Sequence, residues 1–273
     1  MNNRASFMPR LPSIILLCLC VVACTSSERS SLDPAITLYE PLQFKHKTFT
    51  DILSIDEARR LTEMDWTFVY TPDDAQRMIG ANVSNCRDYW SIIPEDGSGA
   101  TSSSAIRTEH YMQKFCERLR SLSKVSPSHR DFVGQPLVSG AFLTRLPSSL
   151  LPEPGGIYNE DGWNRTLEHY RELRARAPTL HELLDTFTVS ENKITGTLSA
   201  QRTLGTCDRQ IQLSPVAKGD FNGDGLADLI VSVGSTSDCD GGSLGELGAF
   251  TDVYLTAHSF DKPLSNMVIA TEE

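Results

Sequence analysis

The sequence predicts an α+β fold with a helix-rich N-terminal half and a C-terminal antiparallel β-sheet. In three segments between residues 54 and 177, apolar side chains recur every three or four positions, as on one face of a helix. Beyond residue 185 the apolar residues alternate with polar ones, which is typical of half-buried strands. An acidic, glycine-containing loop at residues 220–228 joins two of these strands, so a hairpin is expected inside the sheet.

The composition is that of a folded protein with an acidic surface. The chain has 273 residues, and 40% of them are hydrophobic, which is enough to bury a core. Its formal net charge is -10. Nucleic acids are bound through clustered Lys and Arg, so this balance predicts that nucleic acid is not a partner.

The N-terminus has the three parts of an export signal. Arg4 and Arg10 are followed by an uninterrupted apolar run of ten residues, 14–23. A membrane-spanning helix needs about 20 such residues, so the run indicates a secretory signal. It ends in Val21-Val22-Ala23-Cys24, which resembles the bacterial lipobox, where the cysteine becomes lipidated and N-terminal. An ordinary signal peptide with a chance cysteine is the alternative.

The lipobox resemblance implies a location and a first domain division. Cleavage before Cys24 removes residues 1–23 with two arginines and no acids, so the net charge of -10 becomes -12. Residues 24–36 are polar and Ser-rich and are expected to form a flexible tether. Thr25 follows the lipidated cysteine, whereas Gram-negative lipoproteins retained in the inner membrane typically carry Asp there. The resemblance therefore implies a lipid anchor in the outer membrane, with the chain in the periplasm.

Four cysteines remain after processing and lipidation: Cys86, Cys116, Cys207 and Cys239. An even number in an exported chain predicts disulfides, and four cysteines allow three pairings. We favour Cys86–Cys116, because Cys116 adjoins the apolar face of a predicted helix and can reach the loop that holds Cys86.

The helix-rich region is expected at residues 37–178. Ser54 and Glu57 form a capping box that starts a helix. The remaining expected elements, in chain order, are a strand at 66–70, a helix from 71 to 80, a surface loop at 94–103, a helix at 104–122, a strand within 134–146, a connection at 147–162 and a helix at 163–177. On the helix at 104–122, the apolar face comprises Tyr111, Phe115, Leu119 and Leu122.

The β-rich region is expected at residues 179–273. After one capped turn at 179–184, residues 187–189 and 194–198 are predicted to pair as a hairpin. Further strands are expected at 210–216, 229–233 and 249–255.

The loop at residues 220–228 carries the chemistry that the sequence predicts most clearly. Positions 1, 3, 5 and 9 of the loop offer side-chain oxygens, position 6 is a glycine, and position 7 can offer a backbone carbonyl. A hard cation such as calcium takes six to eight oxygens, and this spacing wraps them around one point. The predicted ligands of one calcium ion are Asp220, Asn222, Asp224, Leu226 through its carbonyl, and Asp228. The alternative is a tight turn that binds no metal.

The loop resembles an EF-hand only in its first nine residues, because position 12 is Val231 and a strand follows. Residues 216–231 are more similar to the FG-GAP repeat of integrin-type propellers, in which the ninth position supplies the closing carboxylate. This resemblance assigns that role to Asp228. A propeller needs at least four blades and the pattern occurs once, so a complete propeller is excluded. What the resemblance implies is a strand–calcium loop–strand unit.

The cysteines support a hairpin at this loop. Opposite residues of an antiparallel hairpin have a constant sum of residue numbers. For Cys207 and Cys239 the sum is 446, which centres on residue 223 in the middle of the loop. If the strands continue without bulges, a Cys207–Cys239 disulfide would close the open end of the hairpin.

Other acidic and histidine-containing segments give weaker signals. His181 and Asp185 lie at i and i+4 and resemble half of a zinc-protease motif, but a solvated helix turn is favoured. A second acidic cluster of Asp238, Asp240 and Glu246 is more simply a solvated loop.

The sequence as a whole favours a non-enzymatic envelope lipoprotein, a binding or structural module with a structural calcium ion. Its expected partner is an envelope protein or a glycan. The alternative is a periplasmic hydrolase acting on cell-wall or polysaccharide material.

Overall fold

An antiparallel sheet of eight strands forms the centre of the fold. The computed structural model describes residues 36–71, 82–93, 102–134, 138–151, 160–202, 205–237 and 251–267. Along the sheet run β10 (Ser265–Asn266), β9 (Thr251–Thr256), β8 (Asp228–Ser237) and the long strand β7 (Gly205–Gly219). The predicted α+β class is confirmed, and the described strands form neither a closed barrel nor a propeller.

Strand β7 is shared by two sets of strands along its other edge. Its first part pairs with β6 (Lys193–Arg202), which pairs with β5 (Thr186–Ser190). Its last part pairs with β1 (Ile36–Leu38), which pairs with β4 (Ile52–Leu53). Between β1 and β4 the chain forms a separate ribbon of β2 (Leu42–Phe44) and β3 (Lys47–Phe49). Residues from both ends of the chain therefore build one sheet.

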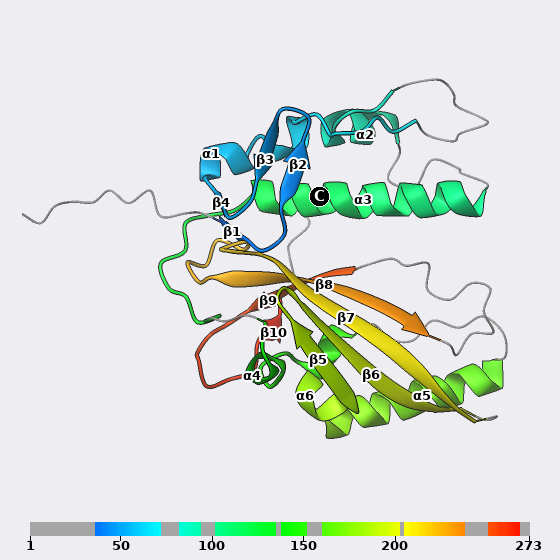
Figure 1. Cartoon of the computed structure of the whole chain (residues 1–273). Helices are drawn as coiled ribbons and strands as arrows, with labels where there is room; N and C mark the ends of the chain where they lie inside the picture. Colours follow the sequence, from blue (N-terminus) through cyan, green and yellow to red (C-terminus); the bar gives the residue numbers. More distant parts are fainter. Residues whose placement is uncertain are drawn as a thin grey trace, which may run out of the picture. The chain divides into compact units, whose positions relative to one another are not determined.

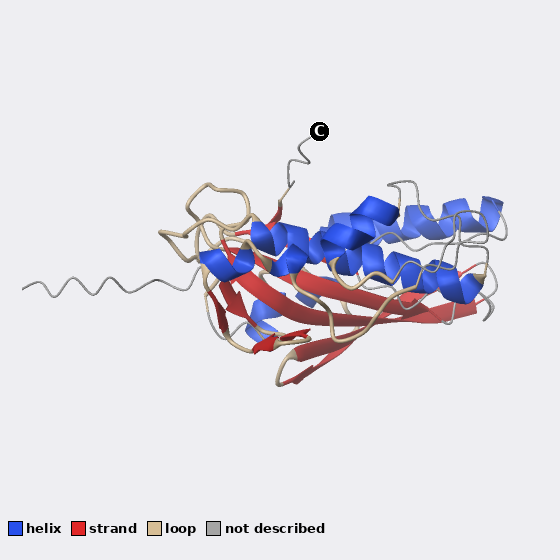
Figure 2. Cartoon of the chain, turned by 90° about the horizontal axis from the view of Figure 1, so that it is seen from above, coloured by secondary structure: helices blue, strands red, loops and turns tan. Residues whose placement is uncertain are grey.

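Helices cover both faces of the sheet, and each face has its own hydrophobic core (Figures 1 and 2). On one face lie α1 (Ile55–Ala58), η1 (Leu61–Glu63), α2 (Cys86–Ile92) and the long helix α3 (Ser103–Ser123). On the other lie α4 (Gly140–Leu143), η2 (Ser148–Leu150), α5 (Glu160–Arg176) and α6 (Leu180–Leu183). Successive side chains of β8 point to opposite faces of the sheet, so Ile230 packs into the first core and Leu229 and Val231 pack into the second.

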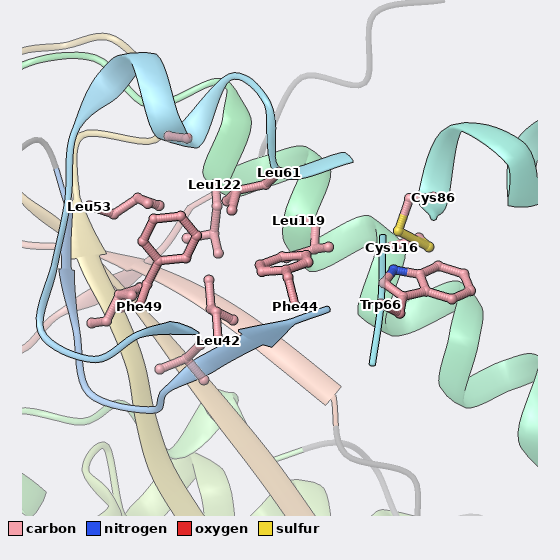
Figure 3. Close-up of a cluster of buried hydrophobic side chains, with 14 of the residues drawn as sticks. Leu42, Phe44, Phe49, Leu53, Leu61, Trp66, Cys86, Cys116, Leu119 and Leu122 are labelled. Carbon is pink, nitrogen blue, oxygen red and sulfur yellow. A yellow bond between two sulfur atoms is a disulfide. The ribbon is translucent and has the colours of Figure 1, made fainter. Parts of the chain in front are cut away.

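Helix α3 is the main element of the first core. It begins where the Ser102 hydroxyl accepts a hydrogen bond from the Ala105 amide at 3.2 Å. Cys116, Leu119 and Leu122 are fully buried; Leu119 and Leu122 lie beside the β2–β3 ribbon and η1, and Cys116 lies beside Trp66 (Figure 3). Tyr111, which was expected on this face, is 49% exposed and stacks on Phe115 at the rim instead.

Several local predictions are confirmed by the structure. Ser54 and Glu57 form both halves of the capping box at the start of α1. Strands β5 and β6 pair as the expected hairpin, with Phe187 opposite Gly196.

The helix expected at residues 71–80 falls almost wholly outside the described residues. None of the described helices is long and apolar enough to cross a membrane.

Two predicted strands are wrong. Within residues 134–146 the chain forms helix α4 rather than a strand, because the Ser139 hydroxyl caps it by accepting from the Phe142 amide at 3.1 Å. Residues 66–70 form only isolated bridges, at Trp66 and Tyr70.

The sequence does not predict strands β1 to β4, because segments of two or three residues are too short to show a period.

Candidate functional site

The predicted calcium loop joins β7 to β8, the two strands with the most extensive pairing. Its base is formed by Asp220 and Asp228, whose side chains are buried, while Asn222 and Asp224 at its tip are exposed. Gly219 lies opposite Asp228 in the hairpin, and Asp228 also faces Thr256 of β9. The loop is therefore fixed to the middle of the sheet.

A β-bulge at Val216 sets the direction of the side chains that enter the loop. Beyond the bulge, away from the loop, the two residue numbers of each pair add up to 446, as for Pro215 and Val231. Between the bulge and the loop they add up to 447, as for Ala217 and Ile230. The extra residue changes which face of the sheet each following residue occupies. Pro215 therefore lies on the same face as Val231 of the second core, whereas Ala217 packs with Ile230 in the first.

Hydrogen bonds inside the loop place its side-chain oxygens next to its backbone amides. The Asp220 carboxylate accepts from the amides of Gly223 at 2.7 Å and Gly225 at 2.8 Å. Asp224 Oδ1 accepts from the Leu226 amide at 2.8 Å. Gly223 and Gly225 have φ angles of 78° and 83°, which a glycine adopts without strain. These bonds hold the loop in a tight turn with the acidic residues around it.

Asp228 is the unusual group of the site. Its side chain is 0% exposed, and its Oδ2 accepts from the Phe221 amide at 2.9 Å, but its Oδ1 has no hydrogen-bond partner. The pKa of this carboxyl is raised to about 6, mainly by burial and also by the nearby carboxylates of Asp224 and Asp220, against the hydrogen bond from the Phe221 amide. The Thr256 hydroxyl also lowers the pKa, but it is not in hydrogen-bonding geometry with Oδ1. A buried, negatively charged oxygen is thus left unsatisfied.

The donor set suits a hard cation. Asp220, Asn222, Asp224 and Asp228 supply oxygens, and the backbone carbonyl of Leu226 can add another. Among the described residues, no three His, Cys, Asp or Glu side chains converge on one point as a preformed metal centre. Asp224 is exposed at the tip, where its Oδ2 accepts from Asn222 Nδ2 at 3.0 Å. Full ligation would therefore require Asp224 to turn toward Asp220 and Asp228.

A second segment, which we call the strap (residues 125–134), runs from the end of α3 along the loop. The Ser126 amide donates to the Asp220 carbonyl at 2.8 Å. The amides of His129 and Arg130 donate to the Gly225 carbonyl at 2.8 and 3.2 Å, and the Ala227 amide donates to the Arg130 carbonyl at 2.7 Å. Sequence reasoning missed the strap, because these contacts are made by backbone atoms and leave no residue pattern.

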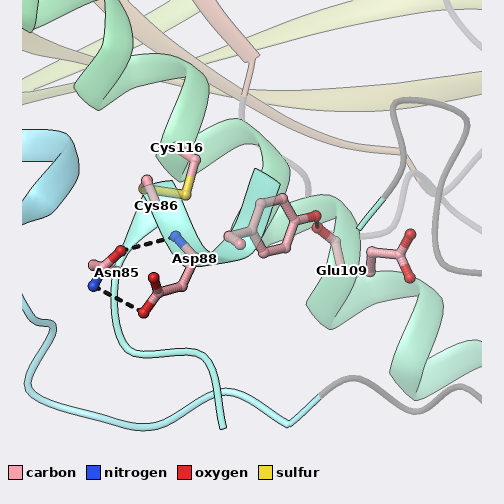
Figure 4. The surroundings of a disulfide bond; sticks show 6 residues. Asn85, Cys86, Asp88, Glu109 and Cys116 are labelled. Carbon is pink, nitrogen blue, oxygen red and sulfur yellow. Dashed lines mark hydrogen bonds between the residues drawn. A yellow bond between two sulfur atoms is a disulfide. The ribbon is translucent and has the colours of Figure 1, made fainter. Parts of the chain in front are cut away.

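The structure contains the predicted Cys86–Cys116 disulfide, with Cα atoms 5.4 Å apart. It ties the start of α2 to the buried face of α3 (Figure 4). Asn85 caps α2 by accepting from the Asp88 amide at 2.9 Å, which sets Cys86 in the first turn of the helix. Cys24 and Cys239 lie outside the described residues, as does the side chain of Cys207.

We predict that Cys207 and Cys239 form the second disulfide. The described β7–β8 pairing ends with Arg209 opposite Ser237, a sum of 446, which is also the sum for the two cysteines. Although the strands contain the Val216 bulge, the register beyond it fits the pair. Peptide mapping without reduction should recover one peptide linking Cys207 to Cys239. Free thiols at both positions would contradict the prediction.

The weaker candidates do not form a site among the described residues. His181 is exposed at the start of α6 and its ring lies 5.6 Å from that of Phe187. Asp185 is exposed in the turn before β5. The acidic cluster of Asp238, Asp240 and Glu246 lies outside the described residues.

The chain was compared with known protein families, characterised proteins and solved structures. No protein-family model, no characterised protein and no solved structure matches it. The lipobox resemblance and the FG-GAP resemblance of the sequence therefore stay predictions.

Proposed function

We propose that this protein is a lipoprotein of the Gram-negative cell envelope, anchored in the outer membrane through Cys24 and facing the periplasm. It acts as a non-enzymatic binding or structural module whose sheet is stabilised by one calcium ion. The sequence of the first 25 residues supports the anchor. The disulfide between Cys86 and Cys116 fits an oxidising compartment.

The observation that carries the calcium assignment is the unsatisfied Oδ1 of Asp228. A buried carboxylate oxygen without a partner destabilises a fold by about 1–3 kcal/mol or more. The nearby carboxylates of Asp220 and Asp224 also raise the pKa of Asp228, because like charges disfavour its charged form. A divalent cation at this point would neutralise the charge, satisfy Oδ1 and offset the repulsion. Without a metal, the Thr256 hydroxyl is the donor that acts on this carboxylate, and it is not in hydrogen-bonding geometry with Oδ1.

A structural role for the ion follows from where its ligands lie. All of them come from one hairpin loop between β7 and β8, at the junction of the two cores. Binding there stabilises the strands that the loop joins. The partner bound by the folded domain is an envelope protein or a glycan, and the lipid anchor keeps the domain at the membrane where such partners occur.

Lipid anchoring is tested at Cys24. Two or more acyl chains hold a protein stably in a bilayer, whereas one gives only marginal binding. Changing Cys24→Ser is expected to shift the protein from the membrane fraction to the soluble fraction, or to leave residues 1–23 uncleaved. Cys239→Ser is a control that should leave fractionation unchanged. Mass spectrometry of the wild-type N-terminus should show acylated Cys24, and an unmodified Cys24 in purified membranes would refute the anchor.

A further inference from the structure

We propose that residues 126–130 of the strap and the loop at 220–228 bind calcium as one coupled unit. This inference rests on the proposed calcium site and adds a second segment to it, distant in sequence. The ion would order this part of the strap, and the strap would in turn raise the affinity of the loop for the ion. Such coupling is reciprocal by thermodynamic necessity.

The two parts of the strap are held by different groups. Residues 126–130 bond to the loop itself, through the carbonyls of Asp220 and Gly225 and the amide of Ala227. The next residues are held from elsewhere. Lys218 Nζ donates to Asp131 Oδ2 at 2.6 Å, and the Arg145 guanidinium donates to the carbonyls of Phe132 at 2.7 Å and Val133 at 2.6 Å. Only the first part therefore depends on the conformation of the loop.

Gly225 connects the ligands to the strap. Its amide donates to Asp220 Oδ2 at 2.8 Å, and its carbonyl accepts from the His129 and Arg130 amides. A Cβ at this position would lie 3.4 Å from His129 Cδ2, so the strap packs directly against the loop. An ion held by Asp220 would therefore fix Gly225, and Gly225 would fix the strap.

The empty loop should hold the strap less firmly. Without a cation, the like charges of Asp220, Asp224 and Asp228 repel one another and the loop opens more readily. Each opening exposes the carbonyls of Asp220 and Gly225 to solvent. The amides of Ser126, His129 and Arg130 then lose their acceptors at the same time. Their hydrogen exchange should consequently report on the occupancy of the metal site.

Amide hydrogen exchange of the whole protein tests the coupling. With calcium at about 100 times Kd, the amides of Ser126, His129 and Arg130 should exchange up to about 100-fold more slowly than in chelator. The amides of Val133 and Gly134 donate to Asp131 Oδ1, so their rates should change by less than about twofold. In Asp224→Ala, calcium should change none of these rates.

The reciprocal effect is measured by calcium titration of two variants at one position. Ser126→Pro removes the amide that donates to the Asp220 carbonyl, and it should raise the Kd for calcium by about fivefold. Ser126→Ala keeps this amide and should bind like the wild type.

The outcomes separate this inference from the calcium proposal. If calcium slows exchange at Gly223 and Leu226 in the loop but not at Ser126, His129 and Arg130, the coupling is wrong and the calcium site stands. If no amide responds and calcium produces no heat on titration, the calcium site itself is wrong, and the coupling with it.

Discussion

Replacing Arg118 by Met is expected to lower the free energy of unfolding by about 3–5 kcal/mol. Arg118 Nε and Nη2 donate to the two oxygens of Asp252 at 2.6 Å each, in a bidentate pair that joins α3 to β9. The two side chains are each only 9% exposed. Removing the guanidinium therefore leaves the Asp252 carboxylate buried and without its cation, and the unfolded state becomes relatively more favourable.

Urea unfolding at pH 7 measures this loss against a matched control. Lys114 and Glu117 form an ion pair on the same helix at 2.9 Å, but both side chains are over 30% exposed. Lys114→Met should consequently lower the free energy of unfolding by less than about 1 kcal/mol. Adding Asp252→Leu to Arg118→Met should recover much of the loss, because the buried carboxylate of Asp252 is then removed together with its cation. If Arg118→Met and Lys114→Met lowered the free energy of unfolding equally, the buried ion pair would contribute no more to stability than the exposed pair.

The loss should also depend on pH. Burial raises the pKa of Glu40, and Arg118 opposes this rise from 3.5 Å away. Without Arg118 the pKa of Glu40 should rise further above its unfolded value. A carboxyl with a raised folded pKa destabilises the fold as pH rises through that range. Arg118→Met should therefore be less damaging near pH 4 than at pH 7, as measured by the same unfolding curves.

Calcium is expected to raise the melting temperature by roughly 5–10 °C over chelator. Binding to the folded state alone stabilises it by about 2.7 kcal/mol at a hundredfold excess over Kd. In a protein of this size each kcal/mol moves the midpoint by about 2–4 °C. Thermal unfolding followed by circular dichroism, with the disulfides intact and again reduced, provides the measurement. If calcium raised the melting temperature neither with the disulfides intact nor with them reduced, the proposed stabilising role of the ion would be contradicted.

Asp228→Asn is the informative variant for this comparison. The amide keeps an acceptor for the Phe221 amide and removes the buried charge. In chelator this variant should therefore melt at or above the wild-type temperature. In calcium it should not respond, whereas the wild type should. A variant that melts lower in chelator would show instead that the Asp228 charge is already well satisfied without metal.

The fold class and the loop could be read from the sequence because both rest on local patterns. The hairpin of β5 and β6 has alternating residues around a short turn, and α3 repeats its apolar positions from Tyr111 to Leu122, over about three helical turns. Helix α4 could not be foreseen in the same way. Its four residues are apolar like those of a short strand, and a single cap at Ser139 decides between the two.

The contacts that complete the site are non-local and therefore escaped prediction. The strap meets the loop through backbone atoms nearly 100 positions apart in the chain, such as Ser126 with Asp220. The pair of Arg118 and Asp252 joins residues 134 positions apart. Asp228 could be predicted as a ligand from its place in the loop, but the lack of a hydrogen-bond partner for its Oδ1 depends on its burial between β7 and β9.

Calorimetric titration of calcium into the chelator-treated, full-length protein tests the central claim most directly. One ion should bind per chain to the wild type and to Asp56→Asn, whose changed carboxylate is exposed and far from the loop in sequence. Asp228→Asn should give no binding heat above dilution. Wild-type heat no greater than that of Asp228→Asn would contradict the calcium site and leave a metal-free turn.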